Sequence, residues 1–214
     1  MKLLSVFLFL FYGSAYTQTN SVGIFEHHTD IGNPKNAGSA QYDKSSNTYI
    51  IKGSGYNIWF DKDEFQYAYK KLKDDFVLTA NFEFAGENGN GHRKIGWMVR
   101  ESTDDNAAHI SAVSHGDGLT VLQWRVNKGD SMRDPEGEIF FPQKKFEVIQ
   151  LQRIGKTFTM KVGHKGEPLQ IVGSHEMPNL SGEVLVGLFV CAHDPEVVQE
   201  AKVRDVHINK PQTQ

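Results

Sequence analysis

Short runs of alternating hydrophobic and polar positions extend along almost the whole chain, and residues that favour turns separate these runs. Between Ser21 and Asn209 no segment has a convincing helical spacing of apolar side chains. Strict alternation is typical of β-strands that bury one face, because successive side chains on a strand point to opposite sides. The pattern therefore predicts an all-β protein.

The predicted strands are bounded by glycine, asparagine, aspartate and proline, which are common in turns. They are residues 41–42, 48–52, 65–72, 76–84, 94–101, 108–115, 119–126, 145–154, 157–164, 170–174, 184–192 and 201–208. So many short strands at regular spacing favour a sandwich of two antiparallel sheets over one open sheet. Two other segments, Asp61–Glu64 and Pro195–Glu200, have helical promise and are short enough to be connectors.

Residues 21–209 have a length that is usual for a single all-β domain. Within this domain two polar, glycine-rich loops, Ala85–Arg93 and Asn127–Glu138, are expected at the rim of the sandwich, because they have too few apolar side chains to pack in a core. The polar tail Lys210–Gln214 is expected to be disordered.

The N-terminus has the pattern of an export signal. Lys2 is followed by an apolar run, Leu3–Tyr12, and then by the small residues Gly13, Ser14 and Ala15. A positive start, a short apolar stretch and small residues together predict a signal peptide over residues 1–17, with cleavage near Ala15 or Thr17. The predicted location is therefore secreted or periplasmic, and no later stretch is long and apolar enough to be a transmembrane helix.

Charge and cysteine content exclude some classes of protein. The formal net charge is −3 and no basic block is present, so nucleic acid is not a predicted partner. Cys191 is the only cysteine, so no internal disulfide forms. It lies in an apolar strand-like run, which predicts a buried and inert thiol.

Three neighbouring strands in the middle of the chain each have one apolar face and one polar face. If the turn Gly116-Asp117-Gly118 closes a hairpin with His115 opposite Leu119, His109 faces Arg125 and Ser111 faces Gln123. The preceding connection brings Arg100 beside His109. The strand pattern thus predicts one row of Arg100, His109 and Arg125 across a sheet, with Met98, Ser111 and Gln123 in the adjacent row.

This polar face is the predicted ligand platform, because arginine, histidine and glutamine donors suit sugar hydroxyls or a carboxylate. The alternative is an ordinary solvent-facing side of an antiparallel sheet. Tyrosines add flat rings on which a sugar ring can pack. The alternative for each tyrosine is that its ring only packs against the protein, with the hydroxyl pointing outward. The predicted ligand-binding residues are Arg100, His109, Ser111, His115, Gln123 and Arg125, with Tyr67 and Tyr69 at the edge.

No cofactor or metal is predicted. His27 and His28 lie near Asp30, but adjacent histidines on a strand point to opposite faces and make a poor chelate. Asp104 and Asp105 are acidic loop residues that could attract calcium, yet they have no ligand-spaced motif around them.

Several stretches of the chain resemble one family in order. They are Asp30–Gly32, Gly38–Tyr42, Tyr49–Phe60 (YIIKGSGYNIWF), Phe65–Phe76 (FQYAYKKLKDDF), Gly96–Glu101 (GWMVRE), His115–Arg125 (HGDGLTVLQWR), Val186–Asp194 (VGLFVCAHD) and Val203–Ile208 (VRDVHI). The chain thereby resembles the DUF1349 type of the concanavalin A-like lectin/glucanase superfamily, sometimes labelled "regulation of enolase protein 1". The resemblance implies a concanavalin A-like jelly-roll β-sandwich, a fold shared with carbohydrate-binding modules, laminarinases and 3-keto-disaccharide hydrolases.

Three functions are consistent with this sequence. The first is a non-catalytic module that binds an oligo- or polysaccharide. The second is a carbohydrate-active enzyme, either a glycoside hydrolase or a 3-keto-disaccharide hydrolase. The Glu-x-Asp-x-x-Glu run of a retaining glucanase does not occur, while His109, His115 and Glu101 leave a histidine- or metal-based mechanism open. The third is a domain that binds another protein or the cell envelope.

Overall fold

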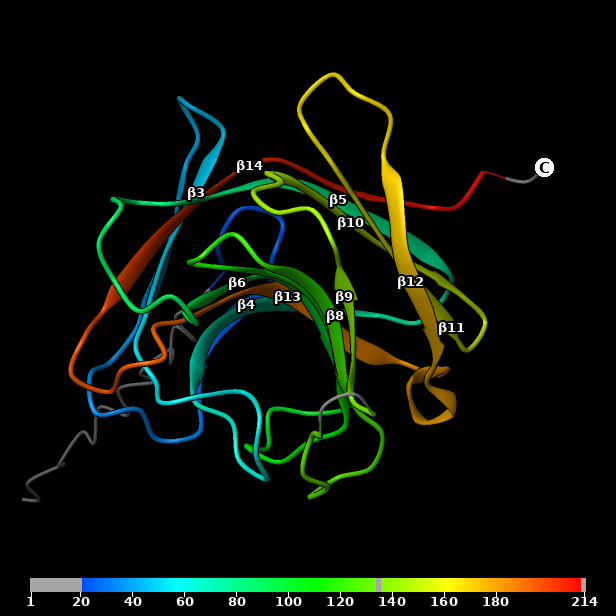
Figure 1. Ribbon diagram of the computed structural model, residues 1–214, viewed down its shortest axis with the longest axis horizontal. Helices are drawn as coiled ribbons and strands as arrows, with labels where there is room; N and C mark the ends of the chain where they lie inside the picture. The colour runs from blue at the N-terminus through cyan, green and yellow to red at the C-terminus, as the bar shows by residue number, and fades with distance from the viewer. Residues whose placement is uncertain (1–20, 134–135, 213–214) are drawn as a thin grey trace, which may run out of the picture.

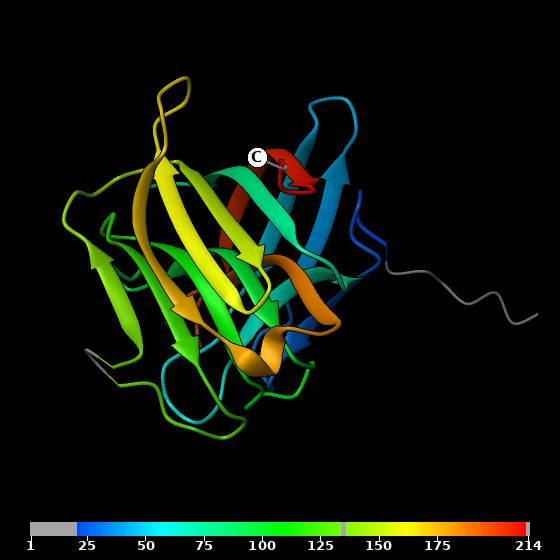
Figure 2. The same ribbon diagram turned by 90° about the vertical axis from the view of Figure 1, so that its right-hand side faces the viewer.

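The computed structural model describes residues 21–133 and 136–212, which fold into two antiparallel sheets of seven strands each. Figure 1 shows the sheets as two curved layers, and Figure 2 shows the same layers from the side. The predicted all-β jelly-roll sandwich is therefore confirmed. The predicted signal peptide, residues 1–17, lies outside the described residues, as do the last two residues of the tail.

The inner sheet has the strand order β1-β4-β13-β6-β7-β8-β9. Its strands are β1 (His27–Ile31), β4 (Phe65–Leu72), β6 (Lys94–Arg100), β7 (His109–His115), β8 (Thr120–Arg125), β9 (Glu138–Phe141) and β13 (Val184–Cys191). Strands far apart in the chain become neighbours, because β13 lies between β4 and β6.

The outer sheet has the order β12-β11-β10-β5-β14-β3-β2. Its strands are β2 (Ser39–Asp43), β3 (Thr48–Gly53), β5 (Phe76–Phe84), β10 (Val148–Ile154), β11 (Thr157–Gly163), β12 (Gln170–Glu176) and β14 (Gln199–Asn209). One 3-10 helix, Pro178–Leu180, lies among the described residues. None of the described segments forms a helix with the length and hydropathy needed to cross a bilayer.

The main hydrophobic core fills the space between the sheets. Each strand contributes the apolar half of its alternating pattern, so Trp97 and Ile110 of the inner sheet meet Ile149 and Leu151 of the outer one. The indole Nε1 of Trp97 donates to the carbonyl oxygen of Ile149 at 3.3 Å and ties the layers together.

The predicted hairpin register is confirmed. The amide of His115 donates to the carbonyl of Leu119 at 2.8 Å, and Ser111 pairs with Gln123 and His109 with Arg125. Strand β6 adds Arg100 opposite His109. The length of the glycine turn and the alternating pattern together set this register. A slip of one residue would move every apolar side chain of the strand out of the core.

Some predicted elements differ from the structure. Asp61–Glu64 is not a helix, because Asp63 forms a β-bridge with Ile58. Pro195–Glu200 is not helical either, and its end belongs to β14. Strands β1 and β9 are absent from the prediction; β9 begins at Glu138, the last residue of a predicted loop.

A second, smaller hydrophobic cluster covers the other face of the inner sheet. Residues 54–64, which connect β3 to β4 and are called the covering loop below, place Ile58 over this face. Ile58 packs with Phe65, Tyr67, Met98 and other residues of the cluster, and it is 1% exposed. This face is therefore largely closed to solvent.

Cys191 belongs to this smaller cluster. Its side chain is fully buried, as the sequence predicts, and its thiol lies 3.7 Å from the carbonyl oxygen of Gly55 in the covering loop. Burial raises the pKa of the thiol to about 11, so the thiolate that reacts with electrophiles is scarce at neutral pH.

Gly187 tests how tightly the covered face is packed. A Cβ atom at this position would lie 2.1 Å from the carbonyl oxygen of Ala68 and 2.8 Å from the ring of Tyr67. We expect Gly187→Ala to lower the free energy of unfolding by about 1–3 kcal/mol, the usual cost of overpacking. Gly182→Ala is the control, because a Cβ there meets nothing within 4 Å. Equal midpoints for both variants in chemical denaturation would contradict this account.

Candidate functional site

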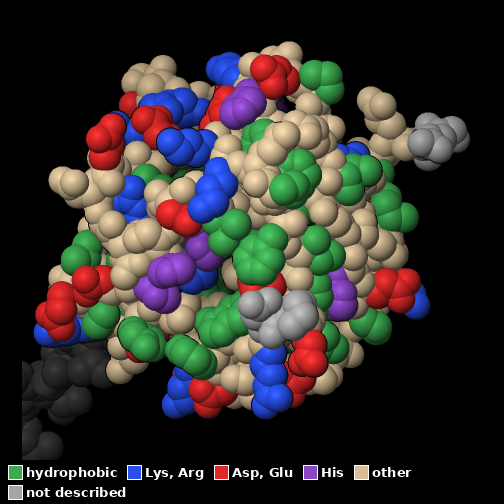
Figure 3. Space-filling view, in the orientation of Figure 1, with side chains coloured by type: hydrophobic (Ala, Val, Ile, Leu, Met, Phe, Trp, Pro, Cys, Tyr) green, Lys and Arg blue, Asp and Glu red, His purple; other side chains and the backbone are tan. Residues whose placement is uncertain are grey.

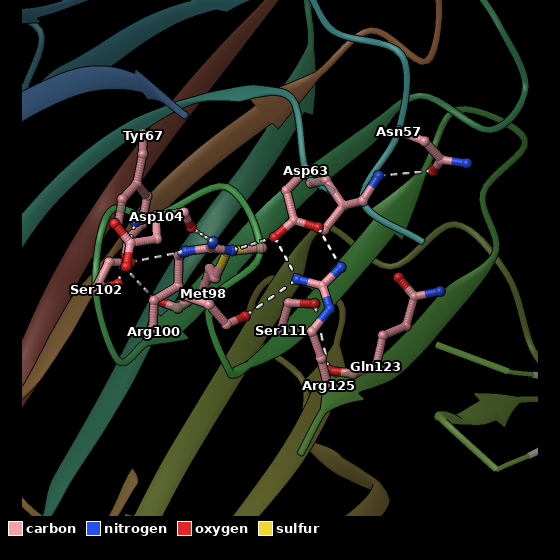
Figure 4. A network of polar contacts seen from close by, with 12 residues as sticks. Asn57, Asp63, Tyr67, Met98, Arg100, Ser102, Asp104, Ser111, Gln123 and Arg125 are labelled. Atoms are coloured by element: carbon pink, nitrogen blue, oxygen red, sulfur yellow. Dashed lines mark hydrogen bonds and ion pairs between the residues drawn. The ribbon is translucent and has the colours of Figure 1, made fainter. Parts of the chain in front are cut away.

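The predicted row of Arg100, His109 and Arg125 exists, but it is buried. Arg100 and His109 are 0% exposed and Arg125 is 1% exposed. The covering loop lies over the row and supplies Asp63, whose carboxylate reaches both guanidinium groups (Figure 4). The open platform that the sequence suggests is wrong in this respect, because a long-range loop occupies the space above the row.

The Asp63 carboxylate accepts hydrogen bonds from both arginines. Arg125 is bidentate, with Nη1 at 2.8 Å from Oδ2 and Nη2 at 2.7 Å from Oδ1. Arg100 donates from Nη1 to Oδ2 at 2.7 Å. Other donors of these two side chains go to backbone carbonyls, including those of Ser102 and Asp104. All five N–H donors of Arg125 and most of those of Arg100 thus have acceptors within the protein, and these contacts hold three loops together.

The electrostatics of this network favour an ionised Asp63. Burial alone would raise the pKa of Asp63, but the hydrogen bond from Arg125 and the positive charges of both guanidinium groups hold it below its usual value. His109 lies between the arginines in the row and is fully buried, and burial holds its pKa well below the ordinary histidine value. His109 is therefore neutral at physiological pH.

The other predicted ligand residues lie on the same face of the inner sheet. Tyr67 is fully buried and its hydroxyl donates to the carbonyl of Met98 at 2.9 Å, while Tyr69 is half-buried and stacks on Tyr67. Ser111 is buried, with its hydroxyl 3.5 Å from the carbonyl oxygen of Gln123. Among the predicted residues, His115 and Gln123 line a cavity of about 480 Å³, and Arg125 lines a smaller one of about 240 Å³. That the rest bind a ligand stays a prediction.

The larger cavity opens at the end of the inner sheet where the covering loop no longer seals it. It has a volume of about 480 Å³, within the range of small-molecule sites. Its polar lining comes from Asn57, His92, Lys94, His115, Gln123, Glu138 and His193, and its apolar lining from Trp59, Leu119 and Phe140. Figure 3 shows histidine side chains gathered next to hydrophobic ones on this face of the molecule. We call it the histidine cavity.

Three histidines meet at the histidine cavity. The ring centroid of His92 lies 5.3 Å from that of His193 and 6.1 Å from that of His115. Burial, with a contribution from the charge of Lys94, lowers the pKa of His115 to about 3 and that of His193 to about 4. Both rings are therefore neutral near pH 7, where each can donate one hydrogen bond and accept another.

Exposed aromatic rings lie at and next to the histidine cavity. Tyr56 is 55% exposed, and its ring is nearly parallel to those of Phe60 and His193, with interplanar angles of 14° and 13°. Phe140, which lines the cavity, is 46% exposed. Exposed apolar side chains that lie together mark a candidate contact surface.

Metal chemistry gets no structural support from the part of the chain that the structure describes. There, no group of three or more histidine, cysteine, aspartate or glutamate side chains has a geometry suited to a metal ion. Asp104 instead forms an exposed ion pair with Lys128 at 2.5 Å. His27 and His28 follow one another in β1, so their side chains point in opposite directions.

No family model and no curated protein matches the chain by sequence. Solved structures do match. A functionally unknown protein from Saccharomyces cerevisiae has a TM-score of 0.58 at 14% identity, with 87% of this chain and 97% of that chain covered. The carbohydrate-binding module CBM66 from Bacillus subtilis has a TM-score of 0.50 at 14% identity, with 89% and 98% covered. The lectin UEA-II, solved with galactose, has a TM-score of 0.51 at 10% identity, with 85% and 96% covered.

The chain has the concanavalin A-like lectin/glucanase fold. Identities this low establish the fold alone, and they assign no ligand and no reaction to the histidine cavity. Within this fold, the covering loop and its Asp63 are features that strand periodicity could not reveal. The sequence offers one indirect signal. Two arginines in one row need a counter-charge if they are buried, and the acidic residues Asp61, Asp63 and Glu64 come directly before the strand that starts at Phe65.

Asp63 should be essential for stability. Asp63→Asn leaves two buried guanidinium groups without their counter-charge, so we expect the free energy of unfolding to fall by about 3–5 kcal/mol. Asp104→Asn, at an exposed position, is the control and should change the free energy of unfolding little.

The stabilisation by Asp63 should also depend on pH. The pKa of Asp63 is lowered in the folded state, so its contribution to the free energy of unfolding is present above the unfolded pKa of about 4 and is lost as the pH falls further. Urea denaturation at pH 7 and pH 3 checks both points, and a difference between wild type and Asp63→Asn that does not shrink at pH 3 would contradict them.

Proposed function

We propose that this protein binds carbohydrate in the histidine cavity and acts as a glycan-binding module. The observation that carries the proposal is the combination of a polar cavity with exposed aromatic rings at and next to it. Sugar hydroxyls need closely spaced donors and acceptors, and the apolar face of a sugar ring packs on a flat aromatic ring. The histidine cavity offers both within one site.

The donors and acceptors of the site have complementary chemistry. Gln123 donates from Nε2 to Glu138 Oε2 at 3.0 Å, which orients the side-chain amide. Lys94 Nζ donates to Asn57 Oδ1 at 3.0 Å, which orients a second amide. Such pre-oriented groups cost little entropy when a polyhydroxylated ligand replaces water.

The resemblance noted in the sequence is consistent with this site. The stretches Tyr49–Phe60, His115–Arg125 and Val186–Asp194 contribute Asn57, Trp59, His115, Gln123 and His193 to the histidine cavity. We therefore also propose that the chain belongs to the DUF1349 type. The module from Bacillus subtilis and the lectin solved with galactose have names that concern carbohydrate, and this agrees with the proposal without carrying it.

Catalysis is the second candidate. A two-carboxylate glycoside hydrolase needs a pair of carboxylates about 5–9.5 Å apart. Among the described residues, Glu138 is the carboxylate that lines the histidine cavity, and it is hydrogen-bonded to Gln123. Binding without turnover is therefore the expected result.

A panel of immobilised glycans, followed by product analysis on those that bind, tests the proposal. Tyr56→Ala should weaken binding about three- to tenfold, because it removes a stacking surface. It should leave the melting temperature nearly unchanged, because Tyr56 is exposed. Ile171→Ala on β12, 63% exposed and on the other sheet, is the matched control. No binding to any glycan, or equal binding by both variants, would refute the assignment of this site.

We also propose export of the protein to the periplasm or the cell exterior. The support is the charge, apolar run and small residues at the N-terminus. Intact-mass measurement of material produced with the full N-terminus should show cleavage near Ala15 or Thr17. Exported protein that retains Met1 would contradict the proposal.

A further inference from the structure

Lys94 is an unusual group in the histidine cavity. It begins β6, lines the cavity and is only 3% exposed. Its ammonium donates to Asn57 Oδ1 at 3.0 Å and to the carbonyl oxygen of His92 at 3.3 Å. Both acceptors are neutral, and within the described ranges Lys94 forms no ion pair with a carboxylate.

A buried ammonium with only neutral acceptors is costly, because burial penalises the charge and nothing offsets it fully. Burial lowers the pKa of Lys94, and the charge of Glu138, which also lines the cavity, opposes this effect in part. The neutral rings of His115 and His193 add no positive charge. A ligand that brings one negative charge to Lys94 would supply the missing compensation.

His115 provides a second, independent observation. It lines the cavity, is 6% exposed, and neither ring nitrogen has a hydrogen-bond partner among the described residues. Nδ1 of His193 is also without a partner there. Buried polar atoms in native proteins are almost always hydrogen-bonded, so these rings are placed to meet the polar groups of a ligand.

We propose that the histidine cavity selects a sugar that carries a carboxylate, a uronic acid, with the carboxylate on the Lys94 ammonium and hydroxyls on the imidazoles. This inference rests on the proposed carbohydrate function and specifies its ligand class. A single ammonium matches a monoanion. The nearby carboxylate of Glu138 repels any anion, but it repels a doubly charged phosphate ester about twice as strongly as a carboxylate.

Matched ligands test this selection on the wild-type protein. Calorimetric or NMR titrations at pH 7 compare galacturonate, glucuronate and mannuronate with galactose, glucose and mannose and with the methyl esters of the acids. In at least one set the acid should bind about tenfold more tightly than the neutral sugar and the ester. The preference should decrease as salt is raised, because salt screens the charge attraction.

Variants identify the group that is responsible. Lys94→Met keeps most of the length of the side chain and should bring the ratio of the affinities for acid and neutral sugar to about one. Because Lys94 also orients Asn57, binding of the neutral sugar should weaken too, so this ratio is the readout. Lys202→Met, on β14 of the other sheet, is the control and should keep the preference. Acetate and galactose 6-sulfate complete the set of probes, because acetate carries the charge without the sugar and the sulfate carries it in a tetrahedral group.

The possible outcomes separate the two proposals. Equal binding of acids, esters and neutral sugars overturns the selection of a carboxylate and leaves the carbohydrate function standing. Binding of neither acids nor neutral sugars, together with a negative glycan panel, overturns both. If acetate binds as tightly as the acids, if the sulfate binds as tightly as galacturonate, or if Lys94→Met keeps the preference, the present inference is wrong.

Discussion

The ion pairs of Asp63 with Arg100 and Arg125 control the architecture of this protein around its candidate site. Two guanidinium groups on neighbouring strands cannot be buried without a counter-charge, and a carboxylate from the covering loop provides it at 2.7 Å from each. The loop therefore has to fold back over the inner sheet. Once it does, Ile58 reaches the apolar part of the same face and completes a second core.

The position of the covering loop decides which part of the sheet remains accessible. It seals the arginine row, and toward the other end of the face its Asn57 forms part of the wall of the cavity that Lys94 and His115 also line. The same loop contributes Trp59 to the cavity lining and stacks Tyr56 on His193, which also lines it. A structural network and a candidate binding site thus share one segment, and the stability of the first determines the geometry of the second.

Strand periodicity was sufficient for the sandwich and for the register of β7 against β8, because both follow from side-chain alternation and a short glycine turn. It also placed Arg100, His109 and Arg125 in one row. It could not show that the row is buried, because that depends on a contact between Asp63 and residues 37 and 62 positions away. For the same reason it missed His92, Lys94 and His193, which the order of strands in the sheet brings together.

The single cysteine lies beneath the covering loop, with its sulfur 3.7 Å from the carbonyl oxygen of Gly55. A thiol in this position can meet a reagent only when the loop lifts away from the sheet. The rate at which a thiol reagent modifies Cys191 therefore reports how often the loop opens, as hydrogen exchange reports local opening of the backbone. The loop also forms part of the cavity wall. Any molecule that occupies the cavity and holds the loop in place would therefore slow the modification of Cys191, whatever the chemical nature of that molecule.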